Sequence, residues 1–341
     1  MENAGGRPTL DDVARAAGVS RATASRVISG TGHSSAASKE AVEAAVEALG
    51  FTPNQAARAL ASNRAHAVAL VIPEPNVLVL ADPFLGGIII GISEAFHQSD
   101  YQLILIILRP DEAPDKAMRL LRPGHVDGAV VVSHHRTGPT EAISRDADLP
   151  VVYVGRPWAV TSPKSTYVDI DNQATGYLAT NHLVTQGRRR IALLSGPPDM
   201  TPSRDRTQGY HQALEEAELT PGPSASGAFT YQGGEEAMKQ ILDSGTRFDA
   251  VFAQSDLMAS GAMRVMTAAG LQIPSDVAVV GVDDSEIARS TDPLLTSVTN
   301  PAAELSLWAA RLLLDAIESG PAPLMADPRI ITPQLVIRQS A

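Results

Sequence analysis

Apolar residues recur with a helical period over the first fifty positions of the chain. Those of the first predicted helix share one face: Leu10, Val13, Ala14 and Ala17. Thr9 precedes this helix and Asp12 lies three positions further on, which is the spacing of a capping box. Gly18 is expected to end the helix.

Two more short helices are predicted before residue 51. Ser20 is placed to cap a helix over 21–29, and a third helix is expected over 36–49, with Gly50 as its stop. The third helix has an apolar stripe: Val42, Val46 and Leu49. Residues 55–61 could form one further helix, but so short a helix is marginal in water and needs a partner.

From residue 67 the pattern changes to continuous Val/Ile/Leu runs that alternate with helical segments. Strands are predicted over 67–72, 103–108, 128–132, 151–154, 191–194, 250–253 and 277–280. Helices are predicted over 88–98, 113–121, 172–186, 206–217 and 255–269. Such alternation is typical of an α/β fold with parallel sheets covered on both faces. A weak internal echo indicates two similar lobes, with a ligand in the cleft beyond their strand ends.

Composition narrows the possible chemistry. The chain has 341 residues, 44% of them apolar, and no cysteine, which excludes disulfides, thiolate nucleophiles and Cys-based metal sites. No apolar run reaches the ~18 residues of a membrane helix, and the first eight residues lack the apolar core of a secretion signal. We therefore expect a cytoplasmic protein.

Charge divides the chain near residue 65. The net charge is −11, yet residues 1–65 hold seven basic and six acidic side chains. The negative charge thus lies in the α/β part, and this change in charge predicts a domain boundary near residue 65.

The first two predicted helices, joined at Gly18, form a helix-turn-helix pattern. The second helix presents Arg21, Ala22, Ser25 and Arg26, and an arginine there can bond guanine as a fork in the major groove. The hydroxyls of Ser20 and Thr23 can contact phosphate. A three-helix scaffold with surface arginines remains the alternative.

These motifs resemble the LacI/GalR family of bacterial transcription regulators. The matching stretch runs from Thr9 to Val27, and residues 51–60 resemble the family's hinge helix. Further matches lie at 168–172, 182–192, 280–284 and 336–338, so the resemblance covers nearly the whole chain.

The resemblance implies a homodimer that binds a pseudo-palindromic operator. Paired hinge helices would enter the minor groove, each inserting Leu60 as a wedge that bends the duplex. The alternative for Leu60 is a simple core contact. Besides the helix-turn-helix residues, the DNA-binding residues implied are Thr9, His33, Ser35, Ser38, Asn54 and Arg58. Family members vary at the positions of Arg21 and Ala22, so the operator sequence is not transferable.

The resemblance also implies an effector site in the cleft. Its residues are Phe84 and Leu85 from the first lobe, Arg206, Phe229, Ser255, Asp256 and Asp283 from the second, and Asn300 on a crossover. Aromatic faces and charged forks suit a sugar. Alternatively, Phe84 and Phe229 belong to the core, Arg206 is a surface residue, and Ser255 and Asp283 cap helices, with Asp284 the better cap of the two aspartates.

We expect a helix-turn-helix domain over 1–52, a hinge helix and linker over 53–65, and an effector-binding and dimerisation domain over 66–341. Its first lobe would span about 66–166 and 297–323, and its second about 167–296 and 324–341.

The sequence thus predicts a repressor whose operator affinity is controlled by a small molecule, expected to be a carbohydrate. The sequence shows no nucleotide-binding motif, no nucleophile motif and no cofactor site. The adjacent histidines His134 and His135 form a poor metal site, so we do not expect an enzyme. A purine or nucleoside effector, or a solute-binding role, remains an alternative.

Overall fold

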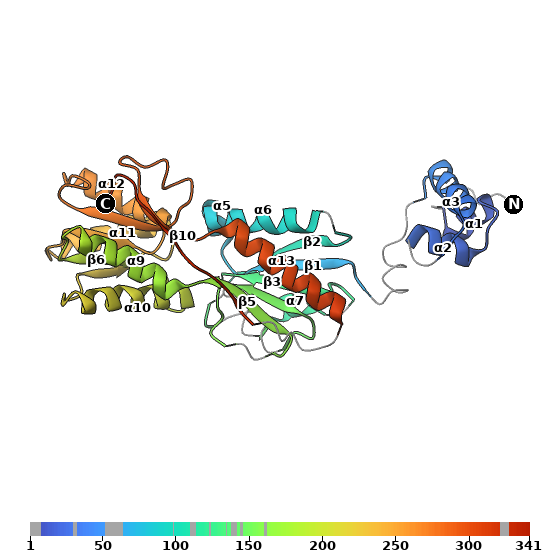
Figure 1. Ribbon diagram of the computed structural model, residues 1–341, viewed down its shortest axis with the longest axis horizontal. Coiled ribbons are helices and arrows are strands. Elements are labelled where there is room, and N and C mark those ends of the chain that lie inside the picture. Colours follow the sequence, from blue (N-terminus) through green and yellow to red (C-terminus); the bar gives the residue numbers. More distant parts are fainter. Residues whose placement is uncertain are drawn as a thin grey trace. The chain divides into compact units, whose positions relative to one another are not determined.

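The computed structural model describes residues 8–29, 33–51, 64–97, 99–109, 114–122, 124–133, 135–137, 142–143, 146–159, 162–320 and 327–341. The chain divides into two compact units, residues 1–65 and residues 66–341 (Figure 1).

The first unit contains the three predicted helices: α1 (Leu10–Ala16), α2 (Arg21–Ser29) and α3 (Ala36–Leu49). The capping box of α1 is present, because Thr9 N–H donates to Asp12 Oδ2 at 3.0 Å and Asp12 N–H donates to Thr9 Oγ1 at 3.3 Å. Gly18 and Gly50 have φ of +64° and +60°, the left-handed conformation that favours glycine after a helix. The predicted helices and stops are confirmed.

The core of this unit is small. Its buried residues are Val13, Ala14, Ala24, Val42 and Ala45. Leu49 was expected in the apolar stripe of α3, but it is 36% exposed, and that prediction is wrong. Ala45 is buried in its place, since it lies one turn after Val42 on the inner face of α3.

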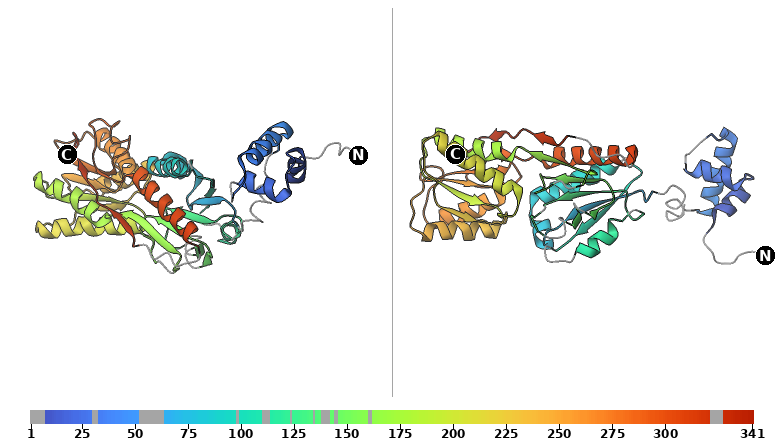
Figure 2. Two further views of the ribbon diagram at one scale, coloured as in Figure 1. Left: turned by 45° about the vertical axis from the view of Figure 1, so that its right-hand side comes forward. Right: turned by 90° about the horizontal axis from the view of Figure 1, so that it is seen from below.

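The second unit consists of two lobes. The sheet of the first lobe has the order β11-β5-β4-β3-β1-β2, with all neighbours parallel. Its strands are β1 (Ala67–Ile72), β2 (Gln102–Ile107), β3 (Gly128–Val132), β4 (Val151–Val154), β5 (Ser165–Ile170) and β11 (Arg329–Ile331). Its helices are α5 (Asn76–Ala81), α6 (Pro83–His97), α7 (Pro114–Leu120) and α13 (Ala302–Ser319). Figure 2 shows α13 and α7 on opposite faces of this sheet.

The sheet of the second lobe has the order β12-β10-β9-β8-β6-β7 and is parallel except for the β10–β12 pair. Its strands are β6 (Ile191–Ser195), β7 (Ser224–Ser226), β8 (Ala250–Ala253), β9 (Ala278–Asp283), β10 (Thr296–Thr299) and β12 (Leu335–Val336). Its helices are α9 (Asn172–Thr185), α10 (Thr201–Glu216), α11 (Tyr231–Asp243) and α12 (Asp256–Ala268).

Side chains of this central sheet alternate between two cores. Along β6, Ile191 and Leu193 pack with α9 and α10, whereas Ala192 and Leu194 pack with α11 and α12. Both faces of the strand are therefore apolar, which explains why it reads as a continuous run.

The chain crosses between the lobes after β5, after β10 and after β11. The predicted lobe boundaries need correction at all three points. β5 extends to Ile170 within the first sheet, β10 lies in the second sheet, and β11 pairs with β5 in the first. A boundary falls where a strand changes its pairing partner, which is a long-range property that the local pattern does not carry.

Two helices begin earlier than predicted, α6 at Pro83 rather than at residue 88 and α10 at Thr201 rather than at 206. Helices α5, α11 and α13 were not predicted. The pair Gly86-Gly87 is interpreted from the sequence as a point of close backbone packing, and a Cβ on Gly87 would indeed lie 2.9 Å from Ala302 Cβ. Because Gly87 has no side chain, α6 packs closely against α13 at this point while remaining a continuous helix.

Candidate functional site

The exposed face of α2 carries the side chains predicted to contact DNA. Arg21, Ala22, Ser25 and Arg26 are exposed, Thr23 is half-buried, and Ala24 faces the core. Arg21 forms an ion pair with Asp11 of α1, with 3.4 Å between Nη1 and Oδ2. Because both partners are exposed, the Arg21 guanidinium is free to exchange this partner for a base edge.

The remaining predicted DNA contacts fall into two groups. Ser20 and Ser35 are exposed and cap α2 and α3, accepting from the N–H groups of Thr23 at 3.1 Å and Ser38 at 3.2 Å. Thr9 and His33 are also exposed. The predicted hinge contacts lie outside the described residues: Asn54, Arg58 and Leu60.

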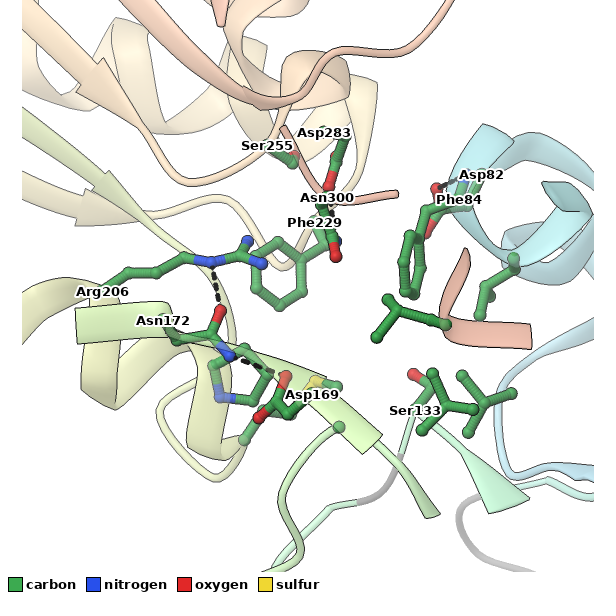
Figure 3. A pocket seen from close by; sticks show the side chains of 17 residues that line it. Asp82, Phe84, Ser133, Asp169, Asn172, Arg206, Phe229, Ser255, Asp283 and Asn300 are labelled. Carbon is green, nitrogen blue, oxygen red and sulfur yellow. Dashed lines mark hydrogen bonds between the residues drawn. The ribbon is translucent and has the colours of Figure 1, made fainter. Parts of the chain in front are cut away.

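A pocket lies between the two lobes of the second unit, with an empty volume of about 680 Å³ counted out to its open mouth (Figure 3). It is lined by seven of the eight predicted effector residues: Phe84, Leu85, Arg206, Phe229, Ser255, Asp283 and Asn300. Four further polar residues line it: Asp82, Ser133, Asp169 and Asn172. Both lobes thus contribute side chains to one cavity at their strand ends.

Arg206 is the central cation of the pocket. It is 4% exposed, so it is not a surface residue. Its Nε donates to Asn172 Oδ1 at 2.9 Å and its Nη1 donates to the Gln254 carbonyl at 2.6 Å. Its guanidinium carbon lies 5.8 Å from the centre of the Phe229 ring. Burial lowers the pKa of Arg206, while the surrounding carboxylates, Asp283 first among them, raise it.

Two glycines allow Arg206 and Asn172 to meet. A Cβ on Gly176 of α9 would lie 2.0 Å from the Arg206 carbonyl oxygen, and one on Gly209 of α10 would lie 2.0 Å from the Gln173 carbonyl oxygen. The two helices therefore cross in backbone contact. This contact brings the start of α9, with Asn172, to the guanidinium of Arg206.

Asp283 faces the pocket at the end of β9. Asn300 Nδ2 donates to its Oδ1 at 3.0 Å, and its φ of +116° turns the chain at this point. Burial raises the pKa of Asp283, whereas the charge of Arg206 lowers it.

The cap prediction for Asp283 and Asp284 is wrong, because turns rather than a helix follow them. Asp284 instead forms ion pairs with Arg289 and Arg338.

Asp256 does not line the pocket, in contrast to its predicted role. It is fully buried at the start of α12, where it accepts from Ser297 Oγ at 2.6 Å and from Ser285 N–H at 2.8 Å. Ser255 lines the pocket, and its Oγ also accepts from Met258 N–H at 3.2 Å as the cap of α12.

The wall from the first lobe carries two carboxyl groups. Asp82 accepts from Phe84 N–H at 2.9 Å at the start of α6, and burial together with the charge of Asp283 raises its pKa to about 7. Asp169 accepts from Asn172 Nδ2 at 3.0 Å, and burial raises its pKa to about 6.

The ring of Phe84 points into the cavity from the first lobe, opposite Phe229 and Arg206 of the second (Figure 3). Phe84 is only half-buried. The arrangement can hold a polar ring whose hydroxyls bond to the charged groups and whose C–H faces meet the aromatic side chains.

Sequence reasoning missed Asp82, Ser133, Asp169 and Asn172 as pocket residues. Ser133 follows β3 directly and Asp169 lies next to the last residue of β5. A polar residue at the carboxyl end of a buried parallel strand was the available signal. For Asn172 no local signal exists, since its partner Arg206 lies 34 residues further along the chain.

The described residues contain no group of three or more His, Cys, Asp or Glu side chains that could hold a metal ion. None of the described helices combines the length and the apolar character needed to cross a membrane.

Two family models match the chain. Residues 9–54 match the bacterial regulatory proteins of the lacI family, and residues 180–341 match a periplasmic binding protein-like domain. The first match covers the helix-turn-helix, and the second covers all of the second lobe except the start of α9 and contributes α13 and β11 of the first.

Individual relatives match over almost the whole chain. The HTH-type transcriptional regulator CelR of Thermobifida fusca is 43% identical over 91% of this chain and 92% of its own length. The ribose operon repressor of Escherichia coli (strain K12) is 34% identical over 98% of this chain and 99% of its own. A solved CelR–cellobiose complex is 40% identical, covers 98% of this chain and all of that one, and has a TM-score of 0.76. These relatives are transcription regulators rather than enzymes.

Proposed function

Because the chain belongs to the LacI family of bacterial transcription regulators, we propose that it is a repressor whose affinity for a pseudo-palindromic operator is set by a small carbohydrate in the inter-lobe pocket. Its action on genomic DNA would place it in the cytoplasm.

One observation supports a carbohydrate above all. Arg206, Asp283 and Asn300 converge on one side of a pocket whose other side presents Phe84. Guanidinium and carboxylate groups can each form two hydrogen bonds to adjacent hydroxyls, and an aromatic face covers the C–H groups of a sugar ring. The complex of the relative CelR with cellobiose supports the same class of ligand.

Operator recognition is assigned to α2 and to a hinge segment. The exposed Arg21, Ala22, Ser25 and Arg26 would enter the major groove, and Leu60 would enter the minor groove. The proposed division is a DNA-binding domain over 1–52, a hinge over 53–65 and an effector-binding domain from residue 66.

We also propose a homodimer, formed through the first lobe. Large apolar side chains are exposed on three neighbouring elements of this lobe, α5, α6 and β2: Val77 at 80%, Leu80 at 87%, Ile90 at 60% and Leu105 at 44%. A second copy of the chain would cover such a patch, and its two-fold symmetry would match two half-sites.

The dimer surface can be tested directly. Leu80→Asp should shift the chain toward monomers in light scattering, whereas Ile330→Asp should not, since β11 lies at the opposite edge of the sheet from β2. Equal behaviour of the two variants would place the interface elsewhere.

The coupling requires only a modest difference in ligand affinity between two arrangements of the lobes. A preference of about 1–3 kcal/mol changes operator affinity by about five- to 150-fold. Either sign is compatible with the pocket: an inducer would favour the arrangement that releases DNA, and a co-repressor the one that binds it.

The decisive experiment measures the binding of the effector and the binding of operator DNA. Thermal shift with cellobiose, ribose, galactose and adenine identifies the effector class, since a ligand at 100 times its Kd adds about 2.7 kcal/mol. Fluorescence anisotropy with DNA fragments from the region upstream of the gene for this chain then measures operator preference with and without that ligand. Absence of any preference over random DNA would overturn the proposal, and stabilisation by adenine alone would replace the sugar by a purine.

A further inference from the structure

A second contact between the lobes lies beside the pocket. Glu74 follows β1 and His135 follows β3 in the first lobe, and Asp199 follows β6 in the second. His135 Nε2 lies 3.0 Å from Glu74 Oε1, and its Nδ1 lies 2.9 Å from Asp199 Oδ2. Glu74 and His135 are largely buried, with 6% and 19% of their side chains exposed.

An imidazole between two carboxylates must carry two protons to bond with both. Neutral histidine has one N–H donor and one acceptor nitrogen, whereas the imidazolium donates from both nitrogens. Hydrogen bonding and charge from Glu74, with Asp199, raise the pKa of His135 to about 9 despite its burial. The bridge is therefore charged and intact at neutral pH.

The charged groups on the neighbouring segments do not replace this bridge. Arg136 and Arg204 lie over the Trp158 ring, and Arg156 forms an ion pair with Asp205 at 2.6 Å. Asp82 adds negative charge near Glu74. His135 is thus the cation that joins the two carboxylates.

The bridge lies away from the crossovers. The chain passes between lobes at β5 and β11 on one edge of the first sheet and at β10 and β12 on one edge of the second. Glu74 follows β1, three strands from β5, and Asp199 follows β6, three strands from β10. At about 4.8 Å per strand this is roughly 14 Å from the crossovers in each sheet. A contact there resists opening of the lobes about the crossovers.

The bridge is also built into the walls of the pocket. Ser133, which lines the pocket, donates to Glu74 Oε1 at 2.5 Å. Met200, which lines it from the other lobe, directly follows Asp199. The carbonyl of Asp199 accepts from Arg136 N–H at 2.8 Å and from Trp158 Nε1 at 2.6 Å, both in the first lobe.

We infer that Glu74, His135 and Asp199 form a proton-dependent clasp that holds the lobes closed, and that His135 is a positioning residue for the effector. The inference rests on the proposed function for its link to an effector, but the clasp itself concerns the ligand-free chain. When His135 loses its second proton, one of its two bonds is lost and the open arrangement gains population. Effector affinity falls in proportion to the closed fraction.

The first test needs no effector. The chain lacks cysteine, so Asp115→Cys on α7 and Lys239→Cys on α11 give one spin label per lobe, at exposed positions. Labelled chains are diluted with unlabelled ones, and the distance distribution is measured by pulsed electron resonance. His135→Gln should lengthen or broaden it, as should Glu74→Gln. His97→Gln, an exposed histidine at the far end of α6, is the matched control and should not.

The second test uses the effector found by thermal shift. His135→Gln should weaken its binding about tenfold or more, the usual effect of losing a hydrogen bond to a charged group. Raising the pH from 7.5 to 10 should weaken binding by the wild-type chain and leave the His135→Gln variant unchanged.

Each result has a distinct meaning. Identical distance distributions in His135→Gln and wild type would overturn the clasp even if a sugar binds. Failure of every candidate ligand to bind, with a clear change in distances, would count against the proposed function and leave the clasp supported.

Discussion

Arg21 and Arg206 place the same guanidinium in opposite settings. Arg21 stands on the surface of a small helical unit, with 70% of its side chain exposed and one exposed partner. Arg206 is 4% exposed in a large α/β body, where four carboxylates contribute to its charge environment. The first is available to a partner and adds little to folding. Arg206 belongs to the buried interior of the α/β body, so the groups expected to bind the effector also contribute to the stability of the fold.

The strongest test of this contrast is Arg206→Ala. It leaves Asp169, which is buried, and Asp283, which is half-buried, without their cation, and loss of the cation from such a site typically costs about 3–5 kcal/mol of unfolding free energy. Urea unfolding followed by tryptophan fluorescence isolates the body, because both tryptophans, Trp158 and Trp308, lie there. The loss should shrink on acidification, since protonated carboxyl groups no longer need the cation.

Arg247→Ala is the control for this variant. Arg247 lies in the loop between α11 and β8 and is exposed, so its loss should change stability by less than about 0.5 kcal/mol. A similarly small change for Arg206→Ala would remove the distinction between buried and exposed functional arginines.

The second test measures how much the small core of the helical unit contributes to its stability. Val13 is fully buried, and it belongs to a core of five buried residues, three of which are alanine. Val13→Ala removes two methyl groups and should cost about 1–3 kcal/mol, from transfer and from the cavity left behind. Hydrogen exchange of peptides from residues 8–51 reports on this unit alone. Val46→Ala, half-buried on α3, should cost less, and equal costs would show that the five residues do not form its centre.

The third test concerns a purely local interaction. Thr9→Ala removes the hydroxyl of the α1 capping box and should cost about 1 kcal/mol, measured by exchange of the α1 amides. Thr9→Ser keeps the hydroxyl and should restore protection. Persistent loss in the serine variant would assign the effect to the Thr9 methyl group rather than to the cap.

The same division between local and distant causes explains what the sequence could predict. The capping box at Thr9, the left-handed Gly18 and Gly50 and the bounds of α3 follow from residues within one or two turns. The β3, β4 and β8 strands follow from their own apolar runs. All these features were predicted with their observed limits.

What could not be predicted depends on contacts between distant segments. Asn172 acquires its role from Arg206 through a crossing of α9 and α10 that Gly176 and Gly209 permit. The lobe of β11 is decided by its pairing with β5, about 160 residues earlier in the chain. The early start of α10 was missed because Met200 offers no side-chain cap, so no local signal marks the first turn, in which Pro202 lies.

The smallest change in stability should come with a large change in function, and Arg21→Ala tests that combination. Its ion pair with Asp11 is exposed at both ends, so its loss should alter unfolding by no more than about 1 kcal/mol. Loss of a forked contact to guanine should reduce operator discrimination by about 1–3 kcal/mol, or about five- to 150-fold in competition with random DNA. Arg15→Ala is the matched control, because Arg15 is an equally exposed arginine on α1 that pairs with Asp12 at 3.0 Å. It should weaken specific and random DNA binding alike, through charge alone. If both variants lost discrimination equally, the preference would come from the charge of the helical unit rather than from the position of Arg21 on α2.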